Sequence, residues 1–120
     1  MTDRTLTMGH RQLTPGVSVI DICGDVTGAS EQVMSDAYDS VGEGVRTVLL
    51  NFSQLDYMNS SGIGLLVTLL VRAQRRRQAL AAYGLSEHYR QIFELCRLDE
   101  AITIHSSESD ALAGAGRSGG

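Results

Sequence analysis

Short strand-like runs and longer helix-like runs alternate along most of the chain. Residues 17–23 alternate between apolar and polar side chains and are rich in β-branched residues, which is typical of a strand. A weaker alternation over residues 4–12 precedes a Thr-Pro-Gly turn at residues 14–16. We therefore expect an antiparallel hairpin, followed by a break at residues 24–28.

Helical spacing dominates the next two long segments. Apolar side chains recur every three or four positions over residues 29–42, with Ser30 placed to cap the first turn and Gly42 to end the helix. Residues 48–52 form a nearly continuous apolar run, which predicts a strand buried on both faces. A second helix is predicted over residues 63–76.

Four more elements complete the expected order. They are a strand at residues 80–83, a helix at 87–96 capped by Ser86, a strand at 101–105 and a short helix at 107–113. Strands that alternate with helices predict an α/β fold: a mixed, mostly parallel sheet of about four to five strands with about four helices packed against it. We expect a single domain over residues 1–120, with its core at about 5–112 and a flexible tail at 113–120.

The most informative stretch is Asp56-Tyr57-Met58-Asn59-Ser60-Ser61-Gly62-Ile63-Gly64, where a predicted strand gives way to a helix. The start of a helix offers unpaired backbone N–H groups and a partial positive charge. A serine there can cap the helix or carry a phosphate group. The two glycines fit either a tight turn packed on the sheet or an opening for a ligand or partner, and both explanations stay open.

Two catalytic interpretations of this stretch are disfavoured by its residues. A P-loop requires a lysine after the glycines, and none is present. A nucleophile elbow requires a glycine two residues before the serine, where Met58 precedes Ser60. We therefore expect no catalytic residues and no enzymatic activity.

The helix that follows has apolar side chains on two sides. At 100° per residue, Leu65, Leu69 and Arg72 fall on the face of Ser61, opposite the face of Leu66. Either a neighbouring helix covers this side, or it forms a docking patch rimmed by Arg72. The basic run at residues 75–77 is interpreted as the solvated end of the helix.

Composition narrows the function further. The net charge of −4 argues against broad nucleic-acid binding, and no apolar run is long enough to span a membrane. The first residues lack the apolar core of a signal peptide, so we expect a cytoplasmic protein. Cys23 and Cys96 are expected to be buried thiols, and no histidine or cysteine spacing marks a metal site. No cofactor is expected.

The hairpin, the Gly24-Asp25-Val26 segment, the stretch at 56–64 and the segment at 90–98 together resemble the STAS domain of bacterial anti-sigma-factor antagonists. The resemblance covers residues 5–112. It implies that the unphosphorylated protein binds an anti-sigma factor that is also a serine kinase of the GHKL type, which frees a sigma factor. Phosphorylation at Ser60, with Ser61 as a second candidate, would break the complex, and a PP2C-type phosphatase would restore it.

The resemblance and the helix pattern together define an expected partner-binding set. It comprises Asp25, Thr27, Asn59, Ser60, Ser61, Gly62, Leu65, Leu69 and Arg72. Asn59 stands where the family usually has an aspartate, which keeps the turn-forming side chain but removes its charge. Two other interpretations remain: a scaffold or accessory STAS domain that is not phosphorylated, and a domain that binds a small anion or nucleotide at the helix start.

Overall fold

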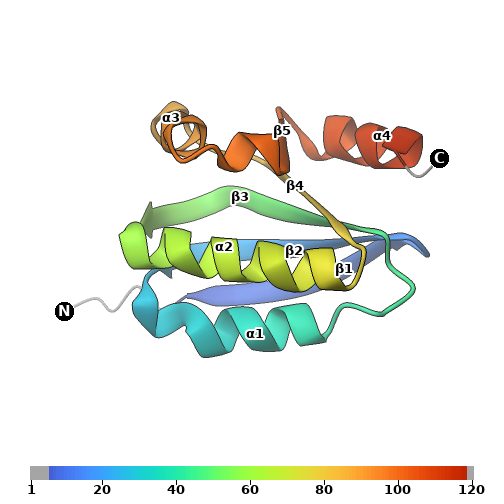
Figure 1. Ribbon diagram of the computed structural model, residues 1–120, viewed down its shortest axis with the longest axis horizontal. Helices are drawn as coiled ribbons and strands as arrows, with labels where there is room; N and C mark the ends of the chain where they lie inside the picture. Colours follow the sequence, from blue (N-terminus) through green and yellow to red (C-terminus); the bar gives the residue numbers. More distant parts are fainter. Residues whose placement is uncertain (1–5, 119–120) are drawn as a thin grey trace.

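The computed structural model describes residues 6–118, which form a five-stranded sheet with helices on both faces (Figure 1). The strands are β1 (Thr7–Thr14), β2 (Val17–Val26), β3 (Thr47–Met58), β4 (Ala79–Tyr83) and β5 (Ile102–His105). The α-helices are α1 (Glu31–Asp39), α2 (Ser60–Arg75), α3 (Glu87–Leu95) and α4 (Glu108–Ser118), and two 3-10 turns are η1 (Gly28–Ser30) and η2 (Leu98–Glu100). The strands lie in chain order, β1-β2-β3-β4-β5.

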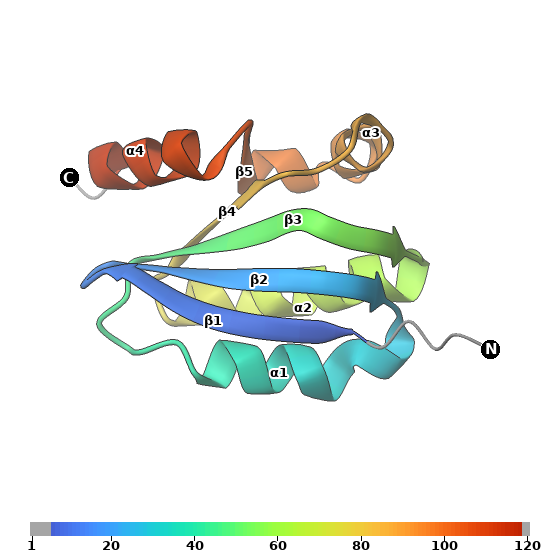
Figure 2. The same ribbon diagram turned by 180° about the vertical axis from the view of Figure 1, so that it is seen from behind.

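The first two strands are antiparallel, and the other three pairs are parallel (Figure 2). The predicted hairpin, the order of elements and the mixed, mostly parallel sheet are therefore confirmed. The first predicted strand begins at Thr7 in the described residues, and residues 4 and 5 lie outside them.

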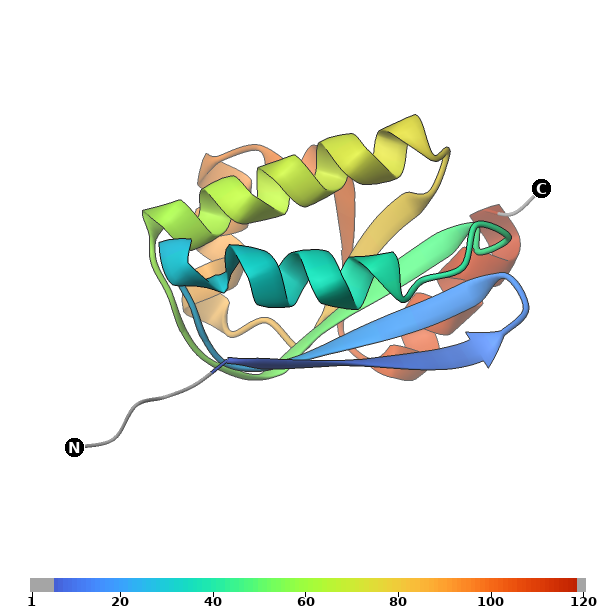
Figure 3. The same cartoon turned by 90° about the horizontal axis from the view of Figure 1, so that it is seen from below.

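Alternate residues of the central strands supply two separate cores, because successive side chains of a strand point to opposite faces. Ile20 and Leu50 face α1 and α2, which lie side by side on one face of the sheet (Figure 3). Val19 and Leu49 face α4 on the other. The predicted burial of the third strand on both faces is thus confirmed for its first half.

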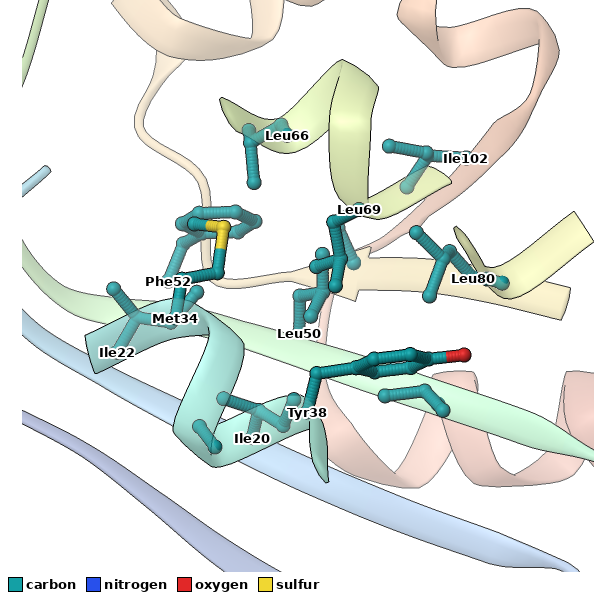
Figure 4. Close-up of a cluster of buried hydrophobic side chains, with 14 of the residues drawn as sticks. Ile20, Ile22, Met34, Tyr38, Leu50, Phe52, Leu66, Leu69, Leu80 and Ile102 are labelled. Carbon is teal, nitrogen blue, oxygen red and sulfur yellow. The ribbon is translucent and has the colours of Figure 1, made fainter. Parts of the chain in front are cut away.

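The larger core lies between the sheet and α1, α2 and α3 (Figure 4). Its largest fully buried side chains are those of Tyr38, Phe52 and Phe93. The rings of Phe52 and Phe93 meet edge to face with centroids 5.9 Å apart, a favoured geometry for aromatic pairs. This contact ties α3 to the middle of β3.

The smaller core shows that the last helix extends beyond its predicted end at residue 113. Helix α4 continues to Ser118, and Ala111 and Ala115 pack against the sheet. The prediction of a flexible tail from residue 113 is therefore wrong for residues 113–118, which are helical. Alanines four residues apart give α4 an apolar side, but the glycines between them lower its helix propensity, so the sequence did not predict the helix this far. Residues 119–120 lie outside the described residues.

Both central strands run further than their apolar segments predict. Strand β2 continues to Val26, past Gly24 at a φ of 108°, so the break expected at residues 24–28 begins later. Strand β3 continues to Met58, well beyond residue 52. The extra length is stabilised by pairing between the two strands, which a local hydrophobic pattern does not reveal.

The start of the first helix also differs from the expectation. Thr27 caps η1 by accepting a hydrogen bond from the Ala29 amide at 3.2 Å, and the Ser30 hydroxyl accepts one from the Thr27 amide at 2.9 Å. Ser30 therefore completes a capping box and does not cap α1. The helix ends at Asp39, before Gly42.

The two cysteines are not buried as expected. Cys96 is exposed and Cys23 is half-buried, and both are free thiols. Cys96 directly follows α3, whose buried side chain is that of Phe93 and whose last residue, Leu95, is exposed.

A polar network joins α4 to the sheet. The Arg11 guanidinium contacts Asp21 at 2.6 Å and Glu108 at 2.8 Å, and the Tyr83 hydroxyl donates to Glu108 at 2.6 Å. The Arg11 guanidinium holds the pKa of both carboxyls below their usual range. This network connects three strands, β1, β2 and β4, to the first residue of the last helix.

The network predicts a pH-dependent contribution to stability. A carboxyl whose pKa is lowered by folding stabilises the protein above its unfolded pKa of about 4, and this contribution is lost as the pH falls further. We expect Arg11→Met to lower the free energy of unfolding at pH 7 by about 1 kcal/mol, since these groups are partly exposed and screened. Denaturant unfolding should show the difference shrinking below about pH 4.

Arg90→Met is the matched control, because Arg90 is exposed and forms no ion pair among the described residues. A difference between wild type and Arg11→Met that persists unchanged at pH 2.5 (roughly one to two units below carboxyl pKa values) would show that the ion pairs contribute nothing.

Candidate functional site

The carboxyl ends of β2 and β3 lie side by side and bring two helix starts together. Val26 pairs with Met58 at the end of the parallel ladder, and the Asn59 amide donates to the Val26 carbonyl at 3.2 Å. Beyond these residues, η1 begins at Gly28 and α2 at Ser60. Parallel neighbours end at the same edge of the sheet, so segments 25–28 and 58–61 form one surface.

Asn59, and neither serine, caps α2. Its side-chain oxygen accepts a hydrogen bond from the Gly62 amide at 2.9 Å. Ser60 is therefore the first residue of the helix, exposed to solvent, and its hydroxyl forms no hydrogen bond within residues 6–118. Of the two roles considered for a serine at this helix start, Asn59 performs the capping. The Ser60 hydroxyl is left available for another role.

Ser61 is exposed beside Ser60 and faces the neighbouring 3-10 turn. A Cβ atom placed on Gly28 would lie 3.4 Å from the Ser61 Cβ, so η1 and the first turn of α2 are in contact. Ser60 and Ser61 thus differ in their surroundings. Ser61 lies against η1, whereas Ser60 is exposed at the rim of the surface formed by segments 25–28 and 58–61.

The two glycines of the stretch have different roles. A Cβ on Gly62 would lie 2.4 Å from the Val26 carbonyl oxygen, so only glycine allows α2 to approach β2 this closely. A Cβ on Gly64 would meet nothing within 4 Å. The packing explanation therefore holds for Gly62, while Gly64 leaves an open spot on the exposed side of the helix.

Two predicted site residues of segment 25–28 complete the rim of this surface. Thr27 is half-buried and its hydroxyl is used to cap η1. Asp25 pairs in register with Tyr57, whose side chain is 49% exposed. The Asp25 Oδ1 atom is buried without a hydrogen-bond partner among the described residues, an unfavourable state that an incoming donor would relieve.

A contact from α3 supports the site and was missed from the sequence. The Met58 amide donates to the Tyr89 hydroxyl at 2.9 Å, which fixes the last residue of β3 immediately before the cap. From the sequence, Tyr89 is only one of the apolar side chains of the helix predicted at residues 87–96. Tyr89 is half-buried against the main core, and a tyrosine hydroxyl in such a position usually finds a hydrogen-bond partner.

The predicted outer face of α2 is wrong. Leu69 is only 3% exposed and belongs to the main core, as do Leu66 and Ala73. The buried stripe of α2 begins at Gly62 and continues through these residues. Apolar side chains surround nearly the whole helix, so its periodicity alone did not identify the buried side.

The other two residues of the expected patch border α1. Leu65 is half-buried and, with Arg72, lines a groove of about 250 Å³ between α1 and α2. The Arg72 guanidinium contacts Asp39 at 2.6 Å and donates to the Ser35 hydroxyl at 3.2 Å. Arg72 therefore ties the two helices together, and the neighbouring-helix explanation is the correct one for this side.

A different line of residues faces solvent along α2. Ser60, Gly64, Val67 and Val71 follow one another at helical spacing, and we call them the α2 outer stripe. Val67 is 43% exposed and Val71 is 40% exposed, large values for apolar side chains. The stripe begins at the available hydroxyl and contains the open position at Gly64.

The geometry suits a charge change at Ser60. In a helix the first amides have no intrahelical acceptor, and Asn59 occupies only that of Gly62. A phosphate on Ser60 would lie beside the remaining N–H groups and the positive end of the α2 dipole. The domain can therefore hold such a group without loss of its packing.

Residues 11–111 match the STAS domain family, and the chain belongs to it. The "Anti-sigma-B factor antagonist" of Listeria monocytogenes is 25% identical over 93 residues, which cover 76% of this chain and 81% of that protein.

Solved structures show the same fold in differently named proteins. The anti-sigma factor antagonist SpoIIAA in its unphosphorylated form has a TM-score of 0.70 at 22% identity, covering 88% of this chain and 93% of that one. Bacillus SpoIIAA in the phosphorylated form has a TM-score of 0.64 at 21% identity, covering 89% and 97%. A sulfate transporter family protein from Wolinella succinogenes has a TM-score of 0.73 at 16% identity, covering 88% of each chain. Within residues 6–118, no helix of this chain is long and apolar enough to cross a membrane.

The two glycines provide a matched pair of substitutions. We expect Gly62→Ala to destabilise the protein by about 1–3 kcal/mol, because its methyl group collides with the Val26 carbonyl. We expect Gly64→Ala to stabilise it by up to about 1 kcal/mol, since alanine favours the helix and meets no neighbour. Chemical denaturation of both variants measures the difference, and equal effects would contradict the close approach at Gly62.

Proposed function

We propose that this STAS domain is an anti-sigma factor antagonist controlled by phosphorylation of Ser60. In its unphosphorylated state it binds an anti-sigma factor that is a serine kinase of the GHKL type, and a sigma factor is released. Phosphorylation ends the interaction, and a PP2C-type phosphatase reverses it. The name of the Listeria relative supports this assignment at the level of the regulatory class.

The observation that carries the proposal is the state of Ser60. Its hydroxyl lies at the first position of α2, exposed and without a hydrogen bond among the described residues. A serine needed to cap the helix would be engaged, but Asn59 performs that role. Ser60 is therefore accessible to a kinase, with Ser61 as the second candidate.

The proposed docking surface is the α2 outer stripe together with the rim at Asp25, Thr27 and Asn59. Val67 and Val71 supply the exposed apolar area, and Gly64 allows a partner's backbone to approach. Leu69 is excluded from this surface by its burial.

A phosphate at the head of this surface would act as a switch. It adds about −1.5 to −2 charge at pH 7, which a complementary interface would have to desolvate. In the free domain the same charge is stabilised by the helix start. Phosphorylation would thus weaken the complex while the fold is preserved. A loss of about 1.4 kcal/mol in binding free energy corresponds to a tenfold lower affinity.

The second candidate function is that of an accessory STAS domain that is not phosphorylated. The similarity in fold to a sulfate transporter family protein favours it, since one fold serves proteins of different classes. A small anion at the start of α2 is the third interpretation, and a thermal shift with nucleotides that disappears in Ser60→Asp would support it.

Substitution of Ser60 tests the switch. We expect Ser60→Asp to weaken binding to the cognate anti-sigma factor at least tenfold, because it places a negative charge at the interface, whereas Ser60→Ala should bind as wild type. Ser109→Asp is the matched control, since Ser109 is an exposed serine in the first turn of α4, on the other face of the sheet. Calorimetric titration measures all four proteins, and wild-type affinity in Ser60→Asp would refute the charge switch.

The modification itself is tested by intact mass. Incubation with the cognate kinase and ATP is expected to add one phosphoryl group of about 80 Da, and Ser60→Ala should abolish the gain. A gain retained in Ser60→Ala but lost in Ser61→Ala would move the site to Ser61. Absence of any gain, with partner binding intact, would favour the accessory-domain function.

A further inference from the structure

A second site lies at the opposite end of α2 from Ser60. The end of α2 lies near the starts of β3 and β4 (Figure 1). Residues just before these two strands line a cavity of about 340 Å³. Its lining residues are Glu43, Gly44, Val45, Arg46, Arg76 and Arg77. Three arginines thus line a concave surface that the proposed switch does not use.

The walls of this cavity are fixed by hydrogen bonds. The buried Gln78 side chain donates to the carbonyls of Gly42 and Val45, at 3.2 and 2.9 Å, and accepts from the Tyr38 hydroxyl. The Ala79 amide donates to the Arg46 carbonyl at 2.8 Å. The loop before β3 and the turn after α2 are therefore joined directly, and the arginines they carry are held as neighbours.

The arginines are placed in two distinct ways. The Arg76 guanidinium stacks on the Tyr38 ring at 4.8 Å from its centroid, which restrains the side chain. Arg77 has a φ of 58°, in the left-handed region where glycine is favoured. Within residues 6–118, neither of these arginines nor Arg46 forms an ion pair with a carboxylate.

The local charge is strongly positive although the chain is acidic. Glu43 supplies one negative charge, and the end of α2 supplies about half of one. Three guanidinium groups exceed this sum, so their mutual repulsion would be relieved by a bound anion. Guanidinium groups match phosphate oxygens in a two-pronged geometry, which favours phosphate over a single-point anion.

The volume of the cavity and the charges around it indicate the size of the ligand. The volume lies at the lower end of the range for small-molecule pockets, about 300–1,000 Å³. A long polyanion would also experience the net charge of −4, which repels it. A small anion senses mainly charges within about 8 Å at physiological salt, where the arginines dominate. We propose that this cavity binds a small, soluble, phosphate-bearing molecule.

Amide NMR titration of the full chain tests the proposal, with inorganic phosphate and pyrophosphate as probes at constant ionic strength. We expect saturable shifts confined to residues 43–46 and 76–79. Arg46→Gln should weaken binding at least tenfold, because charge-assisted hydrogen bonds to the phosphate are lost. Shifts that do not saturate, or that persist unchanged in Arg46→Gln, would overturn the proposal.

A matched pair of variants separates binding from folding. Arg77→Gly should weaken binding at least tenfold while its thermal midpoint stays equal or rises, since glycine relieves the left-handed backbone. Arg97→Gly is the control, because Arg97 has the same backbone conformation, with a φ of 60°, outside the cavity. Equal effects of the two variants on phosphate binding would contradict the site.

Two further experiments distinguish this site from its alternatives. Ser60→Asp should bind phosphate as wild type does, so failure of the switch and failure of this site are distinguishable. Vesicles containing phosphatidic acid present the same phosphate on a lipid. Vesicle binding that depends on Arg46, without binding of soluble pyrophosphate, would overturn the assignment to a soluble ligand.

Discussion

The parallel pairing of β2 with β3, carried to its last residues, is the constraint on which the site depends. It sets Val26 beside Met58, and the Val26 carbonyl then receives the Asn59 amide. The same carbonyl occupies the space where a side chain on Gly62 would lie. One backbone group thereby fixes the approach of α2, the position of its cap and the exposure of the residue that follows the cap.

From that start, α2 extends across the main core from one end of the sheet to the other. Its buried stripe packs on the sheet, and Arg72 ties it to α1. At one end lies the available hydroxyl of Ser60, and at the other lies the cavity lined by Arg76 and Arg77. The helix dipole favours a negative group at the first end, whereas a surplus of guanidinium charge favours an anion at the second. The two proposed sites would thus attract negative charge by different means, the helix dipole at one end and arginine side chains at the other.

Much of the fold was predictable because it is encoded locally. The hairpin, the alternation of strands with helices and the Ser86 cap of α3 follow from side-chain periodicity and capping residues within a few positions. The stretch at residues 56–64 was located from its serines and glycines for the same reason. The ends of β2 and β3 and the extent of α4 were not, since their order comes from pairing and packing with distant segments.

The sequence by itself determined the order of elements, the class of fold and the position of Ser60 at a strand-to-helix junction. Only the tertiary structure decided that Asn59 is the cap, that Leu69 is buried, and that Gly62 but not Gly64 is required by packing. It also placed Arg46 beside two arginines from the far end of α2. Apolar side chains surround α2 almost completely, so its orientation was chosen by the sheet and by α1, through contacts between residues remote in the chain.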